Sequence, residues 1–243
     1  RGGFLRSFEN QVAVIRALGF ETEITIFRPS AAQYDTPITL FLENVRGQEV
    51  TVECSDGRVS ELLRSETSLL CDVTGHSRQK ILVAYPRCDE EFNFLFVGDV
   101  HGVFRHFEEV VQAANQLEPL FIMSNGDMTH SGRLTDYHAF ADLLNYANVP
   151  VFTSIGNHDQ RARGGRATYR KMLAPLYYSF SAHNAAFIVL DSSRKAGLQK
   201  FQYKWLEEEL RLARQANKRI FVILHRPPVC PKYNYLAFSA SAN

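Results

Sequence analysis

The stretch Phe94–Gly102 reads FLFVGDVHG and decides how the rest of the sequence is interpreted. Its first half is a continuous apolar run, which is typical of a strand buried in a parallel sheet. Its second half is a glycine-flanked turn that carries Asp99 and His101. Loops that follow the strands of an open α/β sheet meet at one edge, where ligands bind. The stretch therefore predicts an α/β domain with a polar site directly after a strand.

Three further polar clusters follow apolar runs in the same way. They are Asn125-Gly126-Asp127, Gly156-Asn157-His158-Asp159 and His225-Arg226-Pro227-Pro228. The predicted strands lie at 92–97, 120–123, 149–154, 185–190 and 219–224, and helical spacing occupies 104–117, 135–147 and 199–216. Strands that alternate with helices predict a layered α/β domain with right-handed crossovers. We therefore expect the four clusters to converge on one edge.

The first 88 residues show a different rhythm. Short runs of alternating apolar and polar residues occur at 20–27, 37–42, 49–54, 67–73 and 80–85, separated by turn residues. This spacing predicts a small all-β sandwich domain. Residues 11–18 fit a helix or a strand equally well, and the polar segment 86–91 is the predicted linker. We expect an accessory β-sandwich domain over 1–88 and the α/β domain over 89–243.

Composition is that of an ordinary globular protein, with 45% hydrophobic and 22% charged residues among 243. A net charge of +1 predicts no general nucleic-acid binding, although Arg161, Arg163 and Arg166 form a local basic cluster. No apolar run approaches the roughly 18–20 residues of a membrane-spanning helix, so we expect no membrane span. The compartment stays open between the cytoplasm and export to the periplasm, and the oligomeric state is unknown.

The four cysteines are Cys54, Cys71, Cys88 and Cys230. None forms a C-x-x-C pair, which argues against a zinc knuckle. Cys54 and Cys71 lie in neighbouring strand-like segments. Two interpretations stay open for them: a disulfide in an exported protein, or unpaired thiols in a core.

The residue types in the four polar clusters suit divalent cations of intermediate hardness. Imidazole binds transition metals and carboxylate oxygen binds the harder ions, so Mn²⁺, Fe²⁺ and Zn²⁺ are the expected cations. A carboxylate has two oxygens, and one aspartate can bridge two ions that lie ~3.5–4 Å apart. Asp-x-His, Gly-Asp and a single histidine are each common in polar turns, and Gly156-Asn157-His158-Asp159 is rarer. All four clusters together at strand ends predict a metal site.

The motifs GDVHG, NGD, GNHD and HRPP, spread over residues 92–233, resemble those of the calcineurin-like metallophosphoesterase superfamily. The resemblance implies a four-layer α/β/β/α sandwich with a dinuclear metal site at the sheet edge. It also implies a role for each candidate residue. The implied metal ligands are Asp99 and His101 for the first ion, Asp127 as the bridge, and Asn157 and His225 for the second ion. His158 is the implied catalytic histidine, close to the phosphate.

Two departures from the superfamily pattern matter. The family closes its site with a Gly-His-x-His run, and none follows Pro228 before Asn243. We therefore expect that the domain as given lacks its C-terminal part. Many members also have an aspartate three residues after the bridging aspartate, and it orients the catalytic histidine. His130 stands at that place, so another group must orient His158, and Asp159 is the candidate.

The implied function is hydrolysis of phosphomonoesters or phosphodiesters by a hydroxide that bridges two divalent ions. The run from Gly126 through Tyr137 looks closest to the cyclic-nucleotide phosphodiesterase type, and the implied substrate is a small phosphorylated molecule such as a nucleotide. The alternative is a catalytically impaired protein that keeps the fold for binding or scaffolding. The missing histidine pair favours that alternative, while the five ligands that are present favour the enzyme.

Overall fold

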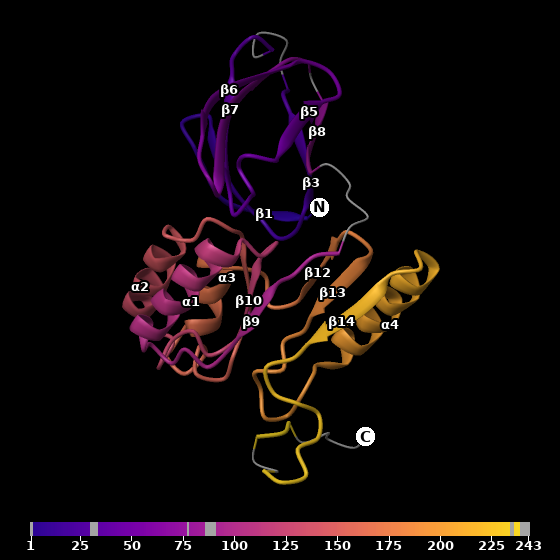
Figure 1. The fold of residues 1–243 in the computed structure, drawn as a ribbon. Coiled ribbons are helices and arrows are strands. Elements are labelled where there is room, and N and C mark those ends of the chain that lie inside the picture. Colours follow the sequence, from indigo (N-terminus) through magenta and orange to yellow (C-terminus); the bar gives the residue numbers. More distant parts are fainter. Residues whose placement is uncertain (1, 30–33, 77, 86–90, 234–235, 239–243) are drawn as a thin grey trace. The chain divides into compact units, whose positions relative to one another are not determined.

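A computed structural model describes residues 2–29, 34–76, 78–85, 91–233 and 236–238 (Figure 1). The chain divides into two compact units, Arg1–Glu91 with Asn148–Pro150 and Phe92–Ala147 with Val151–Asn243. The predicted domain boundary after residue 88 and nearly all of the predicted linker fall within 86–90, outside the described residues.

The described part of the first unit contains eight strands. They are β1 (Gly3–Glu9), β2 (Val12–Ala17), β3 (Glu21–Phe27), β4 (Ile38–Glu43), β5 (Thr51–Cys54), β6 (Arg58–Arg64), β7 (Ser68–Thr74) and β8 (Arg78–Ala84). One sheet has the order β1-β2-β4-β7-β6, and the other has the order β3-β8-β5. Most neighbouring strands are antiparallel, and β2 with β4 is the parallel pair.

Alternating side chains from both sheets form the hydrophobic core of this unit. Leu40 and Leu42 of β4, Val73 of β7 and Ile81 of β8 are all nearly inaccessible to solvent. All five strands predicted in this region are confirmed, and the ambiguous segment 11–18 forms strand β2. Strands β1 and β6 were not predicted, because their side chains are mostly exposed at the two edges of the sheet and leave no apolar alternation.

The disulfide interpretation for Cys54 and Cys71 is wrong, because both cysteines are free. Cys54 lies on β5, and its Sγ accepts a hydrogen bond from Gln79 Nε2 at 3.4 Å. Cys71 lies on β7 in the other sheet and is fully buried. Strands that are close in sequence can belong to different sheets, and the sequence pattern does not show which sheet a strand joins. For this reason the disulfide interpretation placed the two thiols together incorrectly.

The second unit alternates strands and helices. Its elements are β9 (Leu95–Val97), α1 (Phe104–Leu117), β10 (Ile122–Asn125), α2 (Leu134–Leu144), β11 (Val151–Ser154), α3 (Gly165–Met172), β12 (Tyr178–Ala182), β13 (Ala185–Val189), α4 (Lys200–Gln215) and β14 (Arg219–Ile223). One sheet is parallel with the order β11-β10-β9. The other has the order β12-β13-β14, with β12 antiparallel and β14 parallel to β13.

The three helices predicted in this unit are confirmed, and α1 has the predicted bounds. Its apolar residues recur at helical spacing, and Phe107, Val111 and Ala114 are buried. Helix α1 ends at Glu118, whose left-handed backbone allows its N–H to bond the Ala114 carbonyl. Helix α3 and strand β12 were not predicted. Strand β9 is shorter than predicted, and Phe96 is 53% exposed because β9 is an edge strand of this sheet.

Phenylalanine rings fill the space between the two sheets of the second unit. The contributing residues are Phe94 and Phe121, which precede β9 and β10, Phe152 of β11, and Phe180, Phe187 and Phe221 of β12, β13 and β14. Ring centroids meet across the sheets at 5.1 Å for Phe121–Phe187, 5.6 Å for Phe94–Phe221 and 4.4 Å for Phe152–Phe180. Such distances are typical of favourable aromatic pairs, so these contacts hold the sheets together.

The helices of this unit cover the outer sides of the two sheets. Helices α1, α2 and α3 lie together beside the β9–β11 sheet, and α4 packs against β13 and β14 (Figure 1). This arrangement leaves the carboxyl ends of β9, β10, β11 and β14 free to carry loops. Within the described residues, no helix combines the length and apolar character needed to cross a membrane.

The burial of Cys71 predicts an unreactive thiol. Its side chain is fully buried, and desolvation raises its pKa to about 11. Because thiolate is the reactive species, only about one molecule in a thousand would carry it at pH 8. We expect no labelling of Cys71 by iodoacetamide in the folded protein and full labelling in urea, measured by peptide mass spectrometry. Equal labelling of Cys71 in both states would contradict this burial.

Candidate metal centre

All four predicted polar clusters lie directly after strands. Asp99 and His101 follow β9, Asp127 follows β10, the Asn157 loop follows β11, and His225 follows β14. Hydrogen bonds join the loops of the two sheets: Asn125 Nδ2 donates to the Leu224 carbonyl at 3.0 Å, and His225 Nδ1 donates to the Asn125 carbonyl at 2.9 Å. These contacts confirm that the clusters after β10 and β14 converge.

One group of candidate ligands lies beside the first sheet. His101 Nε2 is 3.2 Å from Asp99 Oδ1 and 3.3 Å from Asp127 Oδ2. The potential ligand atoms of these three residues all lie within 4.8 Å of one another, close enough to surround one cation. Asp99 is 68% exposed on its side chain, whereas Asp127 is only 3% exposed, so this group opens toward solvent from the Asp99 side.

A second group lies on the other side of Asp127. His225 Nε2 is 3.4 Å from Asp127 Oδ1 and 3.3 Å from Asn157 Oδ1. The Asn125 carbonyl can only accept a hydrogen bond, so His225 Nδ1 carries hydrogen and Nε2 faces the two oxygens. This is the usual arrangement of a metal-binding histidine, in which a second hydrogen bond fixes the ring. The two oxygens of Asp127 therefore face two separate imidazoles.

The donor set fits divalent transition metals. Carboxylate, imidazole and amide oxygen converge without a thiolate, which suits Mn²⁺, Fe²⁺ or Zn²⁺. Burial works against ionisation of Asp127, but its hydrogen bond to His225 lowers its pKa overall. The same contact raises the pKa of His225 against the effect of its desolvation. The Asp127 carboxylate is thus ionised, and both of its oxygens attract cationic groups.

The backbone around these candidate ligands is unusual. Asp99, His101 and Asp127 adopt left-handed conformations with φ of 55°, 51° and 53°. Side-chain-bearing residues rarely adopt such angles, and they cluster at functional sites. Gly156 permits a close approach as well, because a Cβ atom there would overlap the Asp127 carboxylate. The loops therefore adopt an unfavourable backbone conformation that brings the side chains of Asp99, His101 and Asp127 close together.

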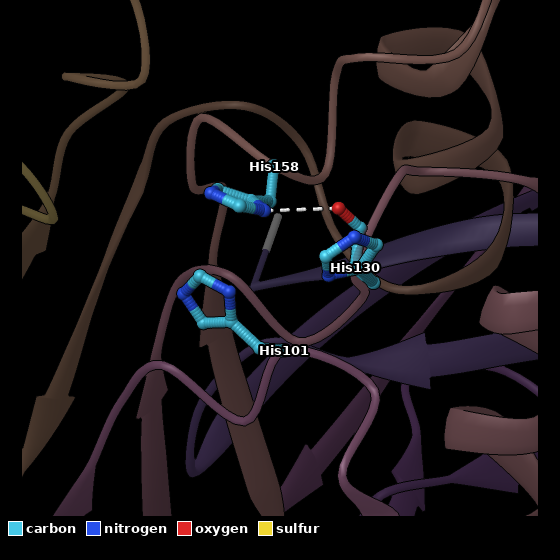
Figure 2. Close-up of side chains that lie close together, drawn as sticks. All are labelled: His101, His130 and His158. Atoms are coloured by element: carbon cyan, nitrogen blue, oxygen red, sulfur yellow. Dashed lines mark hydrogen bonds between the residues drawn. The ribbon is translucent and has the colours of Figure 1, made fainter.

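His158, the predicted catalytic histidine, lies next to the first group (Figure 2). Its Nε2 is 3.9 Å from Asp127 Oδ2, and its backbone N–H donates to Asp127 Oδ1 at 2.7 Å. Its Nδ1 donates to the backbone carbonyl of His130 at 2.9 Å, which leaves Nε2 turned toward the site. Desolvation lowers the pKa of His158. The carbonyl of His130 thus provides the orientation that an aspartate side chain was expected to give.

The His130 imidazole itself faces the same space. Potential ligand atoms of His101, His130 and His158 lie within 4.8 Å of one another, and the three rings surround one region in Figure 2. This proximity was not predicted, because in the sequence His130 is only a departure from the superfamily pattern. Arg161 Nη2 lies 2.5 Å from His158 Nε2, and this contact was not predicted either, although Arg161 belongs to the basic cluster of the sequence.

Asp159 does not orient His158. Its carboxylate is fully buried and accepts hydrogen bonds from Thr129 N, Thr129 Oγ1 and Gly156 N, each at 2.9 Å. Its backbone carbonyl accepts from the hydroxyl of Tyr137 at 2.8 Å. Burial raises the pKa of Asp159, although the hydrogen bonds from Thr129 and Gly156 oppose this effect. Asp159 therefore ties the Asp127 loop to the Asn157 loop.

Replacing Asp159 tests this structural role. In Asp159→Asn, an amide N–H would face buried donors, and unsatisfied groups of this kind cost about 2 kcal/mol in total. We expect the free energy of unfolding in urea to fall by about this amount. The control is Asp142→Asn, at an exposed position on α2. An equal effect of the two substitutions would show that the buried carboxylate does not join the loops.

Replacing the side chain of His130 tests the source of His158 orientation. Because a backbone carbonyl accepts the proton of Nδ1, His130→Ala should leave His158 in the Nδ1–H tautomer. Histidine ¹⁵N spectra of the metal-free protein would report the tautomer. The matched control is His106→Ala, which removes an exposed imidazole from α1. A mixture of tautomers for His158 in His130→Ala alone would assign the orientation to the side chain instead.

Comparison with known proteins adds relatives of similar sequence. A probable glycerophosphodiester phosphodiesterase of Arcobacter nitrofigilis is 28% identical over 46% of this chain and 43% of its own length. A probable cyclic nucleotide phosphodiesterase of Vesicomyosocius okutanii is 26% identical over 53% of this chain and 55% of its own length. A serine/threonine-protein phosphatase of Bos taurus is 29% identical over 50% of this chain and 45% of its own length.

The chain spans about half the length of these curated relatives. The family model described as Calcineurin-like phosphoesterase matches residues 92–242. This range contains every strand of the second unit and all four loops that meet at Asp127. On this match, the chain belongs to the calcineurin-like phosphoesterase family.

Proposed function

We propose that this protein is a dinuclear-metal-dependent phosphoesterase that hydrolyses phosphomonoesters or phosphodiesters. The observation that carries the proposal is the position of Asp127, whose Oδ2 faces His101 and whose Oδ1 faces His225. A carboxylate that offers one oxygen to each of two ligand groups is suited to bridge two cations. The proposal includes a four-layer α/β/β/α domain that starts near residue 89 and an N-terminal β-sandwich that accompanies it.

The proposed ligands divide into two groups around the bridge. Asp99 and His101 would hold one cation, Asn157 and His225 would hold the other, and Asp127 would contact both. Two such cations would supply a hydroxide nucleophile at neutral pH, because cation binding lowers the pKa of water to about 7. Manganese, iron and zinc are the cations that this mixture of carboxylate, imidazole and amide favours.

The other residues of the site position the reacting groups. His158 is proposed to contact the phosphoryl group and, when its Nε2 is protonated, to donate that proton to the leaving oxygen. The His130 carbonyl holds the ring for this role by accepting from Nδ1. The backbone N–H of His158 donates to Asp127 Oδ1, so the histidine and the bridging carboxylate keep a fixed relation. These two hydrogen bonds hold the imidazole ring and the carboxylate in a fixed orientation relative to each other.

The proposed substrate is a small phosphorylated molecule such as a nucleotide. Two relatives are named as phosphodiesterases, of glycerophosphodiesters and of cyclic nucleotides, and a third is named as a protein phosphatase. These names support a phosphoric ester as the reacting bond and leave the rest of the substrate open. The net charge of +1 gives no support for a nucleic-acid polymer.

Substitution of the bridging carboxylate is the direct test. With Mn²⁺ and nitrophenyl phosphate or bis(nitrophenyl) phosphate, Asp127→Asn in the full-length protein should lose about 100-fold or more of kcat, because an amide has one neutral oxygen and cannot bridge two cations. Metal analysis should find fewer bound ions in this variant than in wild type. Asp142→Asn, on the exposed surface of α2, is the control and should keep both properties.

Equal turnover by wild type and Asp127→Asn would refute the assignment. A wild-type protein that binds two metal ions but turns over no phosphoric ester would favour the binding or scaffolding alternative.

A further inference from the structure

Arg161 lies beside the proposed catalytic histidine, where its Nη2 is 2.5 Å from His158 Nε2. We propose that Arg161 binds a terminal phosphate oxygen of the substrate, and that it makes the site favour phosphomonoesters over phosphodiesters. This inference rests on the proposed function and adds a substrate preference to it. It assigns a binding role to a residue that lies outside the metal-ligand set.

Backbone contacts fix the place of Arg161. Its N–H donates to the His158 carbonyl at 3.1 Å, and the next residue, Ala162, donates from its N–H to the Ser131 carbonyl at 2.7 Å. The segment is therefore tied both to the loop after β11 and to the loop after β10. The backbone segment that positions His158 also positions Arg161, and its hydrogen bonds hold this segment in place.

Arg166, another arginine of the basic cluster, is placed differently. Arg166 forms an ion pair with Asp191 and also donates to Gln160 Oε1 and Ser193 Oγ, each at 3.0 Å. Its charge is therefore satisfied within the protein. Within the residues that the structure describes, Arg161 has no carboxylate partner, and its side chain is exposed. Of these two arginines, Arg161 is the one that has charge available for a ligand.

The hydrogen bond from Arg161 to His158 is weaker than a hydrogen bond from Arg161 to a phosphate would be. The guanidinium can only donate, so it donates to the lone pair of a neutral His158 Nε2. A phosphate oxygen carries negative charge, and charge-assisted hydrogen bonds are roughly twice as strong as neutral ones. Arginine also presents several N–H groups in a planar fork that matches phosphate oxygens. A phosphate at the site should therefore draw the guanidinium away from the imidazole, which leaves Nε2 free to bind the proton that it would donate to the leaving oxygen.

The preference for monoesters follows from the number of oxygens and the charge. A phosphomonoester has one terminal oxygen more than a phosphodiester, and it carries close to two negative charges at neutral pH. Cations held by Asp127 and its neighbours would contact only some of the terminal oxygens of the phosphomonoester. The remaining terminal oxygen is available to the guanidinium, whereas a diester has an ester oxygen in its place. Loss of Arg161 should therefore weaken monoester binding more than diester binding.

Calorimetry on the full-length, Mn²⁺-loaded protein tests this preference with two probes, inorganic phosphate and dimethyl phosphate. For Arg161→Ala we expect about 10-fold weaker binding of inorganic phosphate, the usual effect of losing a hydrogen bond between charged groups. Binding of dimethyl phosphate should change by less than about 2-fold, within the effect of an ordinary surface change. Arg161→Lys should lie between, because it keeps the charge and loses the fork.

The matched control is Arg163→Ala, an exposed arginine two residues farther along the same segment. It should leave both affinities unchanged, and circular dichroism should show the same fold in all variants. In turnover, Arg161→Ala should raise KM for nitrophenyl phosphate and lower the ratio of kcat/KM for the monoester over bis(nitrophenyl) phosphate. Arg161→Lys should recover part of that ratio.

Three results would overturn the inference. They are a wild-type protein that binds no phosphate, a loss in Arg161→Ala no larger than in Arg163→Ala, and an equal loss for both probes. If wild type hydrolyses neither ester, the proposed function fails, but the calorimetric comparison still decides the role of Arg161.

Discussion

The packing of aromatic rings between two three-stranded sheets is the interaction on which the second unit depends. Phe187 sits on β13, a strand with every residue buried, and its ring meets Phe121, Phe94 and Phe221. Aromatic side chains bury large areas at little cost in rotamer entropy, and offset or edge contacts add to that burial. By holding the sheets together, these rings bring the ends of β10 and β14 within hydrogen-bond distance of each other.

Asp127 connects the packing of the two sheets to the proposed metal centre. The side chain follows a strand of the first sheet, yet one of its oxygens faces His225, which follows a strand of the second sheet. The contact of His225 with the Asn125 carbonyl and that of Asn125 with the Leu224 carbonyl maintain this relation. Neither sheet alone could assemble both ligand groups. The site is therefore a property of the pair of sheets, and its geometry depends on their spacing.

Sequence patterns were informative where buried apolar side chains recur at a regular spacing. The apolar faces of α1, α2 and α4 and the runs before the polar loops predicted most of the second unit, and the loop residues predicted the convergence at Asp127. Strands β1 and β6 were missed because their side chains are mostly exposed and lack an apolar pattern. Helix α3 was missed because it is short and rich in charged residues, and only Gly165, Tyr169 and Met172 are buried. The acceptor for His158 was missed for another reason: it is a backbone carbonyl, and every residue type has one.

The left-handed backbone at Asp99, His101 and Asp127 carries an energetic consequence. Such conformations cost roughly 1–2 kcal/mol per residue, so together they consume ~3–6 kcal/mol. A domain of this kind has a net stability of only about 5–15 kcal/mol. Selection for stability alone would favour glycine at these positions, because glycine adopts the left-handed conformation without a steric cost. A lineage that no longer needed the site would therefore gain stability by losing it, and substitutions at these three positions would mark that loss of constraint.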